Sequence, residues 1–322
     1  MAHRLAGSNP HELLAAARAG DRRALARLLT LVERAGDDGR DVAAAVFPPP
    51  GQAWVVGLTG PPGAGKSTLV DRVVRLLRDG SEPVAVVAVD PSSPASGGAV
   101  LGDRVRLQAH ADDPGVFVRS VASRGVLGGL AAGVPDMVRV LDAVGWWPWV
   151  LVETVGVGQG EVDATVVADT TVVVLAPGWG DAVQADKAGL LEVADVFVVN
   201  KCDRPGADEA RSQLERMLDL GPAGGRPGGG WRPPVVGTAA STGDGVAELW
   251  EAVGRHRAWL AEGGRLQARR AARLAAELRR AVERQAGENG LRRCDSPDFE
   301  ELANEVTAGR LAPHEAVERL LA

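Results

Sequence analysis

The 322-residue sequence contains no tyrosine and only two cysteines, Cys202 and Cys294. Two thiols cannot build a disulfide framework or a four-thiolate metal site, and such scarcity is typical of a reducing cytoplasm. No run of about 18 apolar residues occurs, so the sequence offers no candidate for a membrane-spanning helix. The N-terminal residues, Met-Ala-His-Arg-Leu-Ala-Gly, lack the apolar core of a secretory signal. These absences predict a cytoplasmic protein that does not associate with membranes.

Positive charge is not in excess, because 36 Lys and Arg face 42 Asp and Glu, which gives a net charge of -6. This balance argues against nucleic acid as a partner. The five histidines are scattered between His3 and His314, and no His/Cys cluster suited to a transition metal is visible. The length is sufficient for one α/β domain of about 200 residues with helical extensions.

Seven short apolar runs alternate with helical stretches in the middle of the chain. Several runs are unbroken and rich in valine, as in Val84-Ala-Val-Val-Ala-Val89. Such runs are typical of strands buried on both faces, so we predict an α/β fold with a mostly parallel sheet and helices on both faces. The predicted strands span residues 54–59, 84–89, 116–120, 149–153, 171–176, 195–199 and 235–239.

The sequence Gly60-Pro-Pro-Gly-Ala-Gly-Lys66-Ser67 fits the pattern G-x-x-x-x-G-K-[ST] and lies between a predicted strand and a predicted helix. Glycines let such a loop fold tightly with its N–H groups turned toward phosphate, and the helix adds the positive end of its dipole. We expect Lys66 to reach the β- and γ-phosphates and the Ser67 hydroxyl to bind Mg²⁺. The predicted phosphate-binding residues are Gly60, Gly63, Ala64, Gly65, Lys66, Ser67 and Thr68.

A second motif, Asn200-Lys201-Cys202-Asp203, ends a buried strand and fits the guanine-specific pattern N-K-x-D. Guanine presents two neighbouring donors, N1–H and the 2-amino group, and one carboxylate at Asp203 can accept both. Adenine offers no such pair, so Asp203 would stay unpaired against it. Lys201 would lay its stem along the base, and Thr238 and Ala239 follow the last strand in the loop that supports guanine from the other side. The motif predicts GTP and GDP as ligands.

Two acidic residues end strands beside the P-loop strand, Asp90 and Glu153. An acidic residue at that place typically holds Mg²⁺, directly or through water, so both are candidate metal ligands. Gly156 is expected to give its N–H to the γ-phosphate. Ras-like GTPases place a water-orienting glutamine directly after this glycine, whereas this chain has Val157 there. We therefore expect slow intrinsic hydrolysis.

Helical periodicity appears on both sides of the strand-rich region. Residues 11–35 predict one or two amphipathic helices broken at Gly20-Asp21. After residue 262 a helix and two shorter helices are expected, and an apolar stripe at Leu266, Leu274, Leu278 and Val282 predicts a homodimer. We divide the chain into an N-terminal helical extension (1–50), a P-loop GTPase domain (51–262) and a C-terminal helical dimerisation arm (263–322).

Four longer segments carry a more specific signal, at residues 89–104, 123–129, 153–159 and 177–189. Together they resemble the MeaB/ArgK family of SIMIBI-class GTPases, to which the human methylmalonic aciduria type A protein is related. The resemblance covers about residues 10–320, although Cys202 stands where the family usually has alanine. By position it implies a catalytic set of Lys66, Asp90, Asp103 and Glu153, and metal contacts from Ser67, Asp90, Asp103 and Glu153.

The resemblance implies a chaperone for an adenosylcobalamin-dependent acyl-CoA mutase, most often methylmalonyl-CoA mutase. Such proteins gate cofactor loading and protect or rescue the mutase, and the mutase stimulates their GTPase activity. Two other interpretations remain: a kinase linked to amino-acid transport, the older description of ArgK-like sequences, and a metal-insertion GTPase. A kinase must yield a phosphorylated acceptor, and a metal-insertion protein needs His/Cys ligands.

Overall fold

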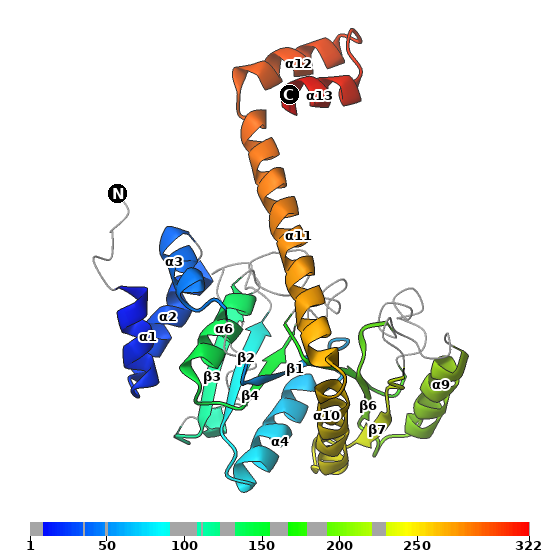
Figure 1. Cartoon of the computed structure of the whole chain (residues 1–322). Coiled ribbons are helices and arrows are strands. Elements are labelled where there is room, and N and C mark those ends of the chain that lie inside the picture. Colours follow the sequence, from blue (N-terminus) through cyan, green and yellow to red (C-terminus); the bar gives the residue numbers. More distant parts are fainter. Residues whose placement is uncertain are drawn as a thin grey trace. The chain divides into compact units, whose positions relative to one another are not determined.

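The computed structural model describes residues 9–34, 36–48, 51–90, 108–110, 112–122, 133–154, 167–178, 192–220 and 230–321 (Figure 1). The chain divides into two compact units, Met1–Arg269 and Arg270–Ala322. The first unit contains the whole sheet. No helix in the described part of the chain has both the length and the apolar character needed to cross a membrane.

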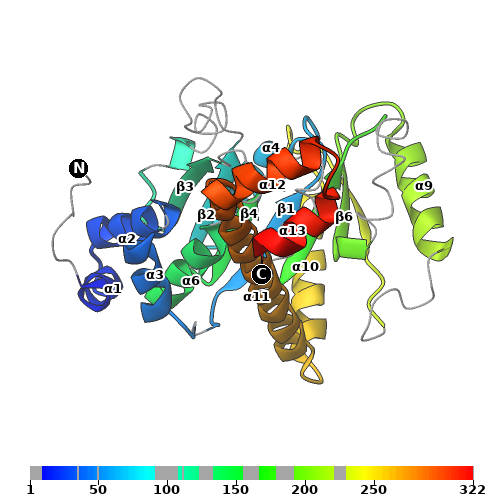
Figure 2. The same ribbon diagram turned by 90° about the horizontal axis from the view of Figure 1, so that it is seen from above.

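The first unit is built on a seven-stranded sheet in the order β3-β2-β4-β1-β5-β6-β7 (Figures 1 and 2). Every pairing between these strands is parallel, which confirms the predicted sheet. Each strand differs from its predicted bounds by at most two residues. The strands are β1 Trp54–Thr59, β2 Val84–Asp90, β3 Val116–Ala122, β4 Trp149–Glu153, β5 Thr170–Leu175, β6 Val196–Asn200 and β7 Val235–Thr238.

Helices cover both faces of the sheet because successive valines of each strand point to opposite sides. On one face, α4 (Lys66–Asp79) and α10 (Val246–Ala261) share a core with residues such as Val56, Leu58 and Val172. On the other face, α6 (Val134–Val144) packs over β1, β2 and β4, and α9 (Ala207–Leu220) packs over β5, β6 and β7.

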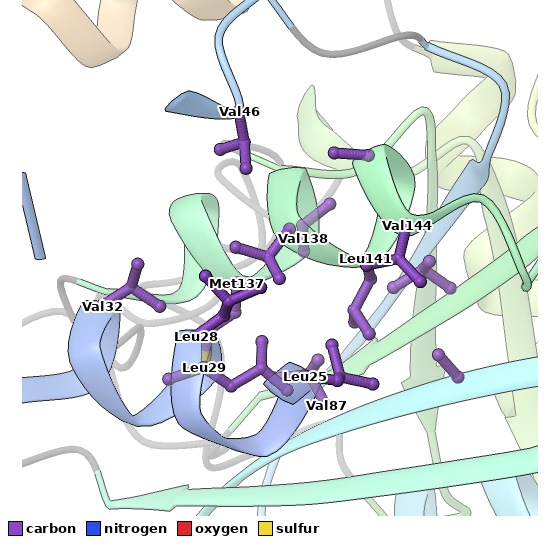
Figure 3. Packing of buried hydrophobic residues seen from close by; sticks show 14 of the residues in the cluster. Leu25, Leu28, Leu29, Val32, Val46, Val87, Met137, Val138, Leu141 and Val144 are labelled. Atoms are coloured by element: carbon purple, nitrogen blue, oxygen red, sulfur yellow. The ribbon is translucent and has the colours of Figure 1, made fainter. Parts of the chain in front are cut away.

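The N-terminal helices belong to the core of the first unit. They are α1 (Pro10–Arg18), α2 (Arg22–Arg34) and α3 (Asp37–Ala45). Leu25, Leu28 and Leu29 of α2 are fully buried and pack against α6 (Figure 3). The predicted break at Gly20-Asp21 is present, and the Asp21 carboxylate accepts from the backbone N–H groups of the next helix. The helices α1, α2 and α3 therefore share one continuous hydrophobic core with the sheet.

The C-terminal helices are α11 (Arg265–Cys294), α12 (Pro297–Thr307) and α13 (Pro313–Leu321), in agreement with the predicted helices. The first residues of α11 still belong to the first unit, because Leu266 packs against the core beneath α10. Beyond them α11 has no buried residue, and Leu274, Leu278 and Val282 are exposed by 39%, 67% and 60%. The compact unit thus extends to Arg269.

Candidate nucleotide-binding site

The P-loop connects the end of β1 to the start of α4, as its sequence predicts. Gly60, Gly63 and Gly65 have φ angles of 134°, 75° and 95°, which favour glycine. A Cβ on Gly60 would lie 2.0 Å from the Val174 carbonyl oxygen, and one on Gly65 would lie 2.3 Å from Asn200 Nδ2. The loop therefore needs glycine for both its turn and its close packing.

Lys66 is buried in the first turn of α4, with an exposed fraction of 8%. Its Nζ donates to the carbonyl oxygens of Gly60, at 2.8 Å, and Pro61, at 3.2 Å. A buried ammonium is costly unless it is paired, and neutral carbonyls compensate its charge less well than an anion does. The loop thus holds a positive charge where phosphate would be received. Thr68 is half-buried on the same turn, and the Ala64 side chain is buried.

Ser67 and Glu153 meet beside this lysine. The Ser67 hydroxyl donates to Glu153 Oε1 at 2.6 Å, and both side chains are buried. Glu153 ends β4 and pairs in register with Leu58 of β1 and Ala88 of β2. Asp90 ends β2 at the same edge, two residues beyond Ala88, and only its backbone is described. Hydroxyl and carboxylate oxygens are donors that Mg²⁺ accepts.

Several predicted site residues lie outside the part of the chain that the structure describes. These are Asp103, Gly156 and residues 179–189 of the additional switch segment. Among the described residues, no group of three or more His, Cys, Asp or Glu side chains could by itself hold a metal ion. The described residues thus supply neighbouring oxygen donors, Ser67 and Glu153, but no complete metal cage.

The predicted guanine motif is bonded directly to the P-loop. Asn200, at the end of β6, donates through Nδ2 to the Ala64 carbonyl oxygen at 2.8 Å, and Lys201 Nζ donates to the Gly63 carbonyl oxygen at 2.7 Å. Lys201 has a φ of 61°, an uncommon conformation for a residue with a side chain. Asp203 is exposed. The two motifs, far apart in sequence, therefore form one surface.

The loop after β7 completes this surface. Asn200 Oδ1 accepts from the Thr238 hydroxyl and from the Ala240 N–H, both at 3.1 Å. The Cys202 N–H donates to the Thr238 carbonyl oxygen, and the Ala239 N–H donates to the Asp244 carbonyl oxygen, each at 2.9 Å. The N–H groups of Cys202 and Ala239 are thus already hydrogen-bonded within the protein. The loop could therefore support a base through packing while both of these hydrogen bonds remain in place.

Two further residues of this region were missed by the sequence analysis. Arg72 on α4 donates to the backbone of the loop after β7, and Asp244 closes that loop by the bridge to Ala239. Neither residue belongs to a motif. No local sequence pattern indicates that Arg72 donates a hydrogen bond to Ala240, which lies 168 positions further along the chain. Only the packing of α4 beside this loop makes them visible.

Cys202 lies inside the predicted guanine motif, and its surroundings disfavour the nucleophilic thiolate form of its side chain. Desolvation by the surrounding loop raises the pKa of its thiol, and the neighbouring carboxylates of Asp203 and Asp244 raise this pKa further. The thiol is therefore protonated at neutral pH, and the reactive thiolate is scarce. The charge of this loop comes from Lys201 and Asp203.

A parallel sheet with a P-loop at its carboxyl edge, joined to an N-K-x-D motif, defines a P-loop protein of the GTPase class. Residues 25–291 match the family described as methylmalonyl Co-A mutase-associated GTPase MeaB, and the chain belongs to this family. The resemblance recognised from the sequence segments is thereby confirmed.

Individual relatives agree with the family. A protein of Pyrococcus abyssi described as a GTPase is 46% identical over 96% of this chain and 95% of its own length. The mitochondrial methylmalonic aciduria type A homolog of Mus musculus is 35% identical over 67% of this chain and 52% of its own length. A solved structure described as an LAO/AO transport system kinase is 28% identical, covers 98% of this chain and 97% of that one, and has a TM-score of 0.74.

Proposed function

We propose that this GTPase acts as a chaperone for an adenosylcobalamin-dependent acyl-CoA mutase, gating cofactor loading and protecting or reactivating the mutase. The observation that supports nucleotide-dependent action best is the direct bonding of Asn200 and Lys201 to the P-loop. Because base-reading and phosphate-binding residues form one unit, a bound guanine nucleotide would be recognised along its whole length. The family description supports methylmalonyl-CoA mutase or a close relative as partner.

The phosphate end of this site would be held by the P-loop N–H groups and Lys66. The buried ammonium now rests on two carbonyl oxygens, and phosphate oxygens would compensate its charge better. Ser67, Glu153, Asp90 and Asp103 would hold Mg²⁺, with Ser67 as a direct ligand and the carboxylates contacting it directly or through water. Bound Mg²⁺ would neutralise charge on the β- and γ-phosphate oxygens.

The base end would be read by Asp203, whose exposed carboxylate can accept from both guanine donors. The Lys201 stem would lie along the ring, because its ammonium is already held on the Gly63 carbonyl oxygen. Thr238 and Ala239 would contact the opposite side. This arrangement supports a strong preference for GTP and GDP over adenine nucleotides.

The partner is tested by steady-state GTP hydrolysis with and without each cobalamin-dependent mutase encoded in the same genome. We expect slow basal hydrolysis, because Val157 replaces the glutamine of Ras-like enzymes, and at least about a tenfold rise with the cognate mutase, or about 1.4 kcal/mol in barrier height. Gln184→Ala or Lys187→Ala should reduce the stimulation. If no mutase binds or changes the rate, the chaperone function is refuted. A phosphorylated acceptor among the products would instead favour a kinase.

We further propose that a second copy of this chain covers the exposed stripe of Leu274, Leu278 and Val282 in a homodimer. Light scattering should find the full-length chain dimeric at micromolar concentration. Leu278→Asp combined with Val282→Asp should give a monomer that keeps GDP binding, whereas Glu283→Lys, on another face of α11, should leave the dimer intact. A full-length chain that is monomeric in this assay would refute the dimer.

A further inference from the structure

The loop after β7 is held by an arginine of the helix that begins at the P-loop. Arg72 Nε donates to the Ala240 carbonyl oxygen at 2.8 Å, and its Nη2 donates to the next carbonyl oxygen, that of Ser241. Arg72 is half-buried on the second turn of α4. The planar guanidinium is a rigid fork of donors, so it fixes two consecutive carbonyl groups at once.

Ala240 is thereby held on both of its backbone groups. Its N–H donates to Asn200 Oδ1, and its carbonyl oxygen accepts from Arg72. The Ala240 side chain is buried, with an exposed fraction of 3%. A buried carbonyl group without a partner is costly, and in the described part of this loop Arg72 is the donor that satisfies it. Loss of Arg72 would therefore release the loop on the side away from Asn200.

The helical scaffold gives this contact a functional meaning. Lys66 and Ser67 lie on the first turn of α4, at the phosphate end of the site, and Arg72 lies on the following turn. One helix thus connects the predicted phosphate end with the loop that is proposed to support the base. We infer that Arg72 is a positioning residue that sets the guanine-supporting loop at the correct distance from the P-loop, and so contributes to selection of guanine nucleotides.

This inference rests on the proposed guanine recognition, and it adds a residue that touches neither base nor phosphate. Lysine at position 72 would keep the charge but present a point donor that cannot hold two carbonyl groups in a plane. The charge alone would therefore not restore the geometry. Arg75 provides a matched control, because it lies three residues, or about one turn, further along the same helix, its side chain is 50% exposed, and it pairs with Asp71 rather than with the loop.

The experiment measures GDP and ADP affinity by calorimetry for the full-length chain and for Arg72→Ala, Arg72→Lys and Arg75→Ala. We expect Arg72→Ala to weaken GDP binding by about tenfold, the scale of one hydrogen bond to a charged group, and to lower the ratio of ADP to GDP dissociation constants. Arg72→Lys should lie between Arg72→Ala and the unmodified chain, and Arg75→Ala should match the unmodified chain. In GTP hydrolysis the KM should rise more than kcat falls.

The outcomes separate this inference from the proposed function. An unmodified chain that binds ADP as tightly as GDP would refute guanine recognition itself. If the unmodified chain prefers GDP but the Arg72 variants keep the same ratio, Arg72 has no positioning role. If Arg72→Ala does not fold, the decision passes to Arg72→Lys: a lowered ratio supports the role, and an unchanged ratio overturns it.

Discussion

At the carboxyl edge of the sheet, Lys66 and Lys201 donate to backbone carbonyl oxygens of the P-loop, whereas at the amino edge a buried charge is paired with other side chains. Asp195, which directly precedes β6, is fully buried. Arg269 donates to the Asp195 carboxylate through Nη1, at 3.1 Å from Oδ1, and through Nη2, at 2.6 Å from Oδ2. The Thr171 N–H donates to Oδ2 at 2.8 Å.

His256 extends this amino-edge cluster. Its Nε2 lies 3.4 Å from Asp195 Oδ1, and its Nδ1 lies 2.9 Å from the Thr170 hydroxyl. The same Thr170 hydroxyl accepts from Trp54 Nε1 at 3.0 Å, so this threonine joins the histidine to the first strand of the sheet. The rings of Trp231 and Trp259 lie 4.9 and 5.9 Å from the His256 ring.

The comparison teaches how one sheet serves two purposes. At the amino edge, the buried Asp195 carboxylate is paired with the guanidinium of Arg269, an arrangement that suits stability. At the carboxyl edge, cations rest on neutral carbonyl groups, an arrangement that an anion can improve. We therefore expect substitutions at the amino edge to affect folding and substitutions at the carboxyl edge to affect binding.

The largest effect is expected for Arg269→Ala. This change leaves the Asp195 carboxylate buried without its main cation, so the free energy of unfolding should fall by about 3–5 kcal/mol. Urea denaturation measures the loss. Arg255→Ala, which removes an exposed arginine 4.0 Å from Glu251, should cost less than about 1 kcal/mol. Equal, small losses for both variants would show that the amino-edge pair does not stabilise the fold.

The next effect is expected for Lys66→Ala, at the opposite edge. Removal of its charge should weaken GDP binding by about 2–3 kcal/mol, the scale of hydrogen bonds to charged groups. The free energy of unfolding should change by less than about 1 kcal/mol, because Lys66 donates to carbonyl oxygens of the P-loop and is not part of the apolar core. Calorimetry with GDP and urea denaturation test both statements. If Lys66→Ala lowered the free energy of unfolding strongly but bound GDP normally, Lys66 would serve stability rather than binding, contrary to the role assigned to the carboxyl edge.

A smaller and more selective effect is expected for Asp203→Asn. The amide would present a donor to guanine N1–H, so GDP binding should weaken by about 1–3 kcal/mol, the usual worth of a bidentate contact to a base. Xanthosine diphosphate, whose base carries a 2-oxo acceptor in place of the 2-amino donor of guanine, should bind more tightly to the variant than to the unmodified chain. Competition between the two nucleotides measures the change. Unaltered GDP preference would exclude Asp203 as the base reader.

The smallest effect is expected for Cys202→Ala. The thiol is exposed, and its raised pKa keeps it protonated at neutral pH, so GDP affinity should change by less than about 0.5 kcal/mol. Alkylation by iodoacetamide should accelerate only as the pH rises above the ordinary range for a thiol. Fast alkylation at pH 7 would show that the neighbouring carboxylates do not control this thiol.

Much of the fold could be predicted because its signals are local. Unbroken valine runs gave the strands to within two residues, since a strand buried on both faces must be apolar on both faces. The helix α3 was not predicted: it is short and contains Gly39, whose missing side chain lets α2 approach, because a Cβ there would lie 2.8 Å from the Leu31 carbonyl oxygen. That signal has meaning only once the two helices are packed.

The sequence by itself determined the two motifs whose residues are neighbours in the chain. These are the glycines and Lys66 of the P-loop, and the N-K-x-D residues at the end of β6. Only the tertiary structure decided which distant residues support them. Ser67 and Glu153 are 86 positions apart, Asp195 and Arg269 are 74 apart, and Arg72 and Ala240 are 168 apart. These pairs follow from strand order and helix packing, which bring together residues that no local spacing relates.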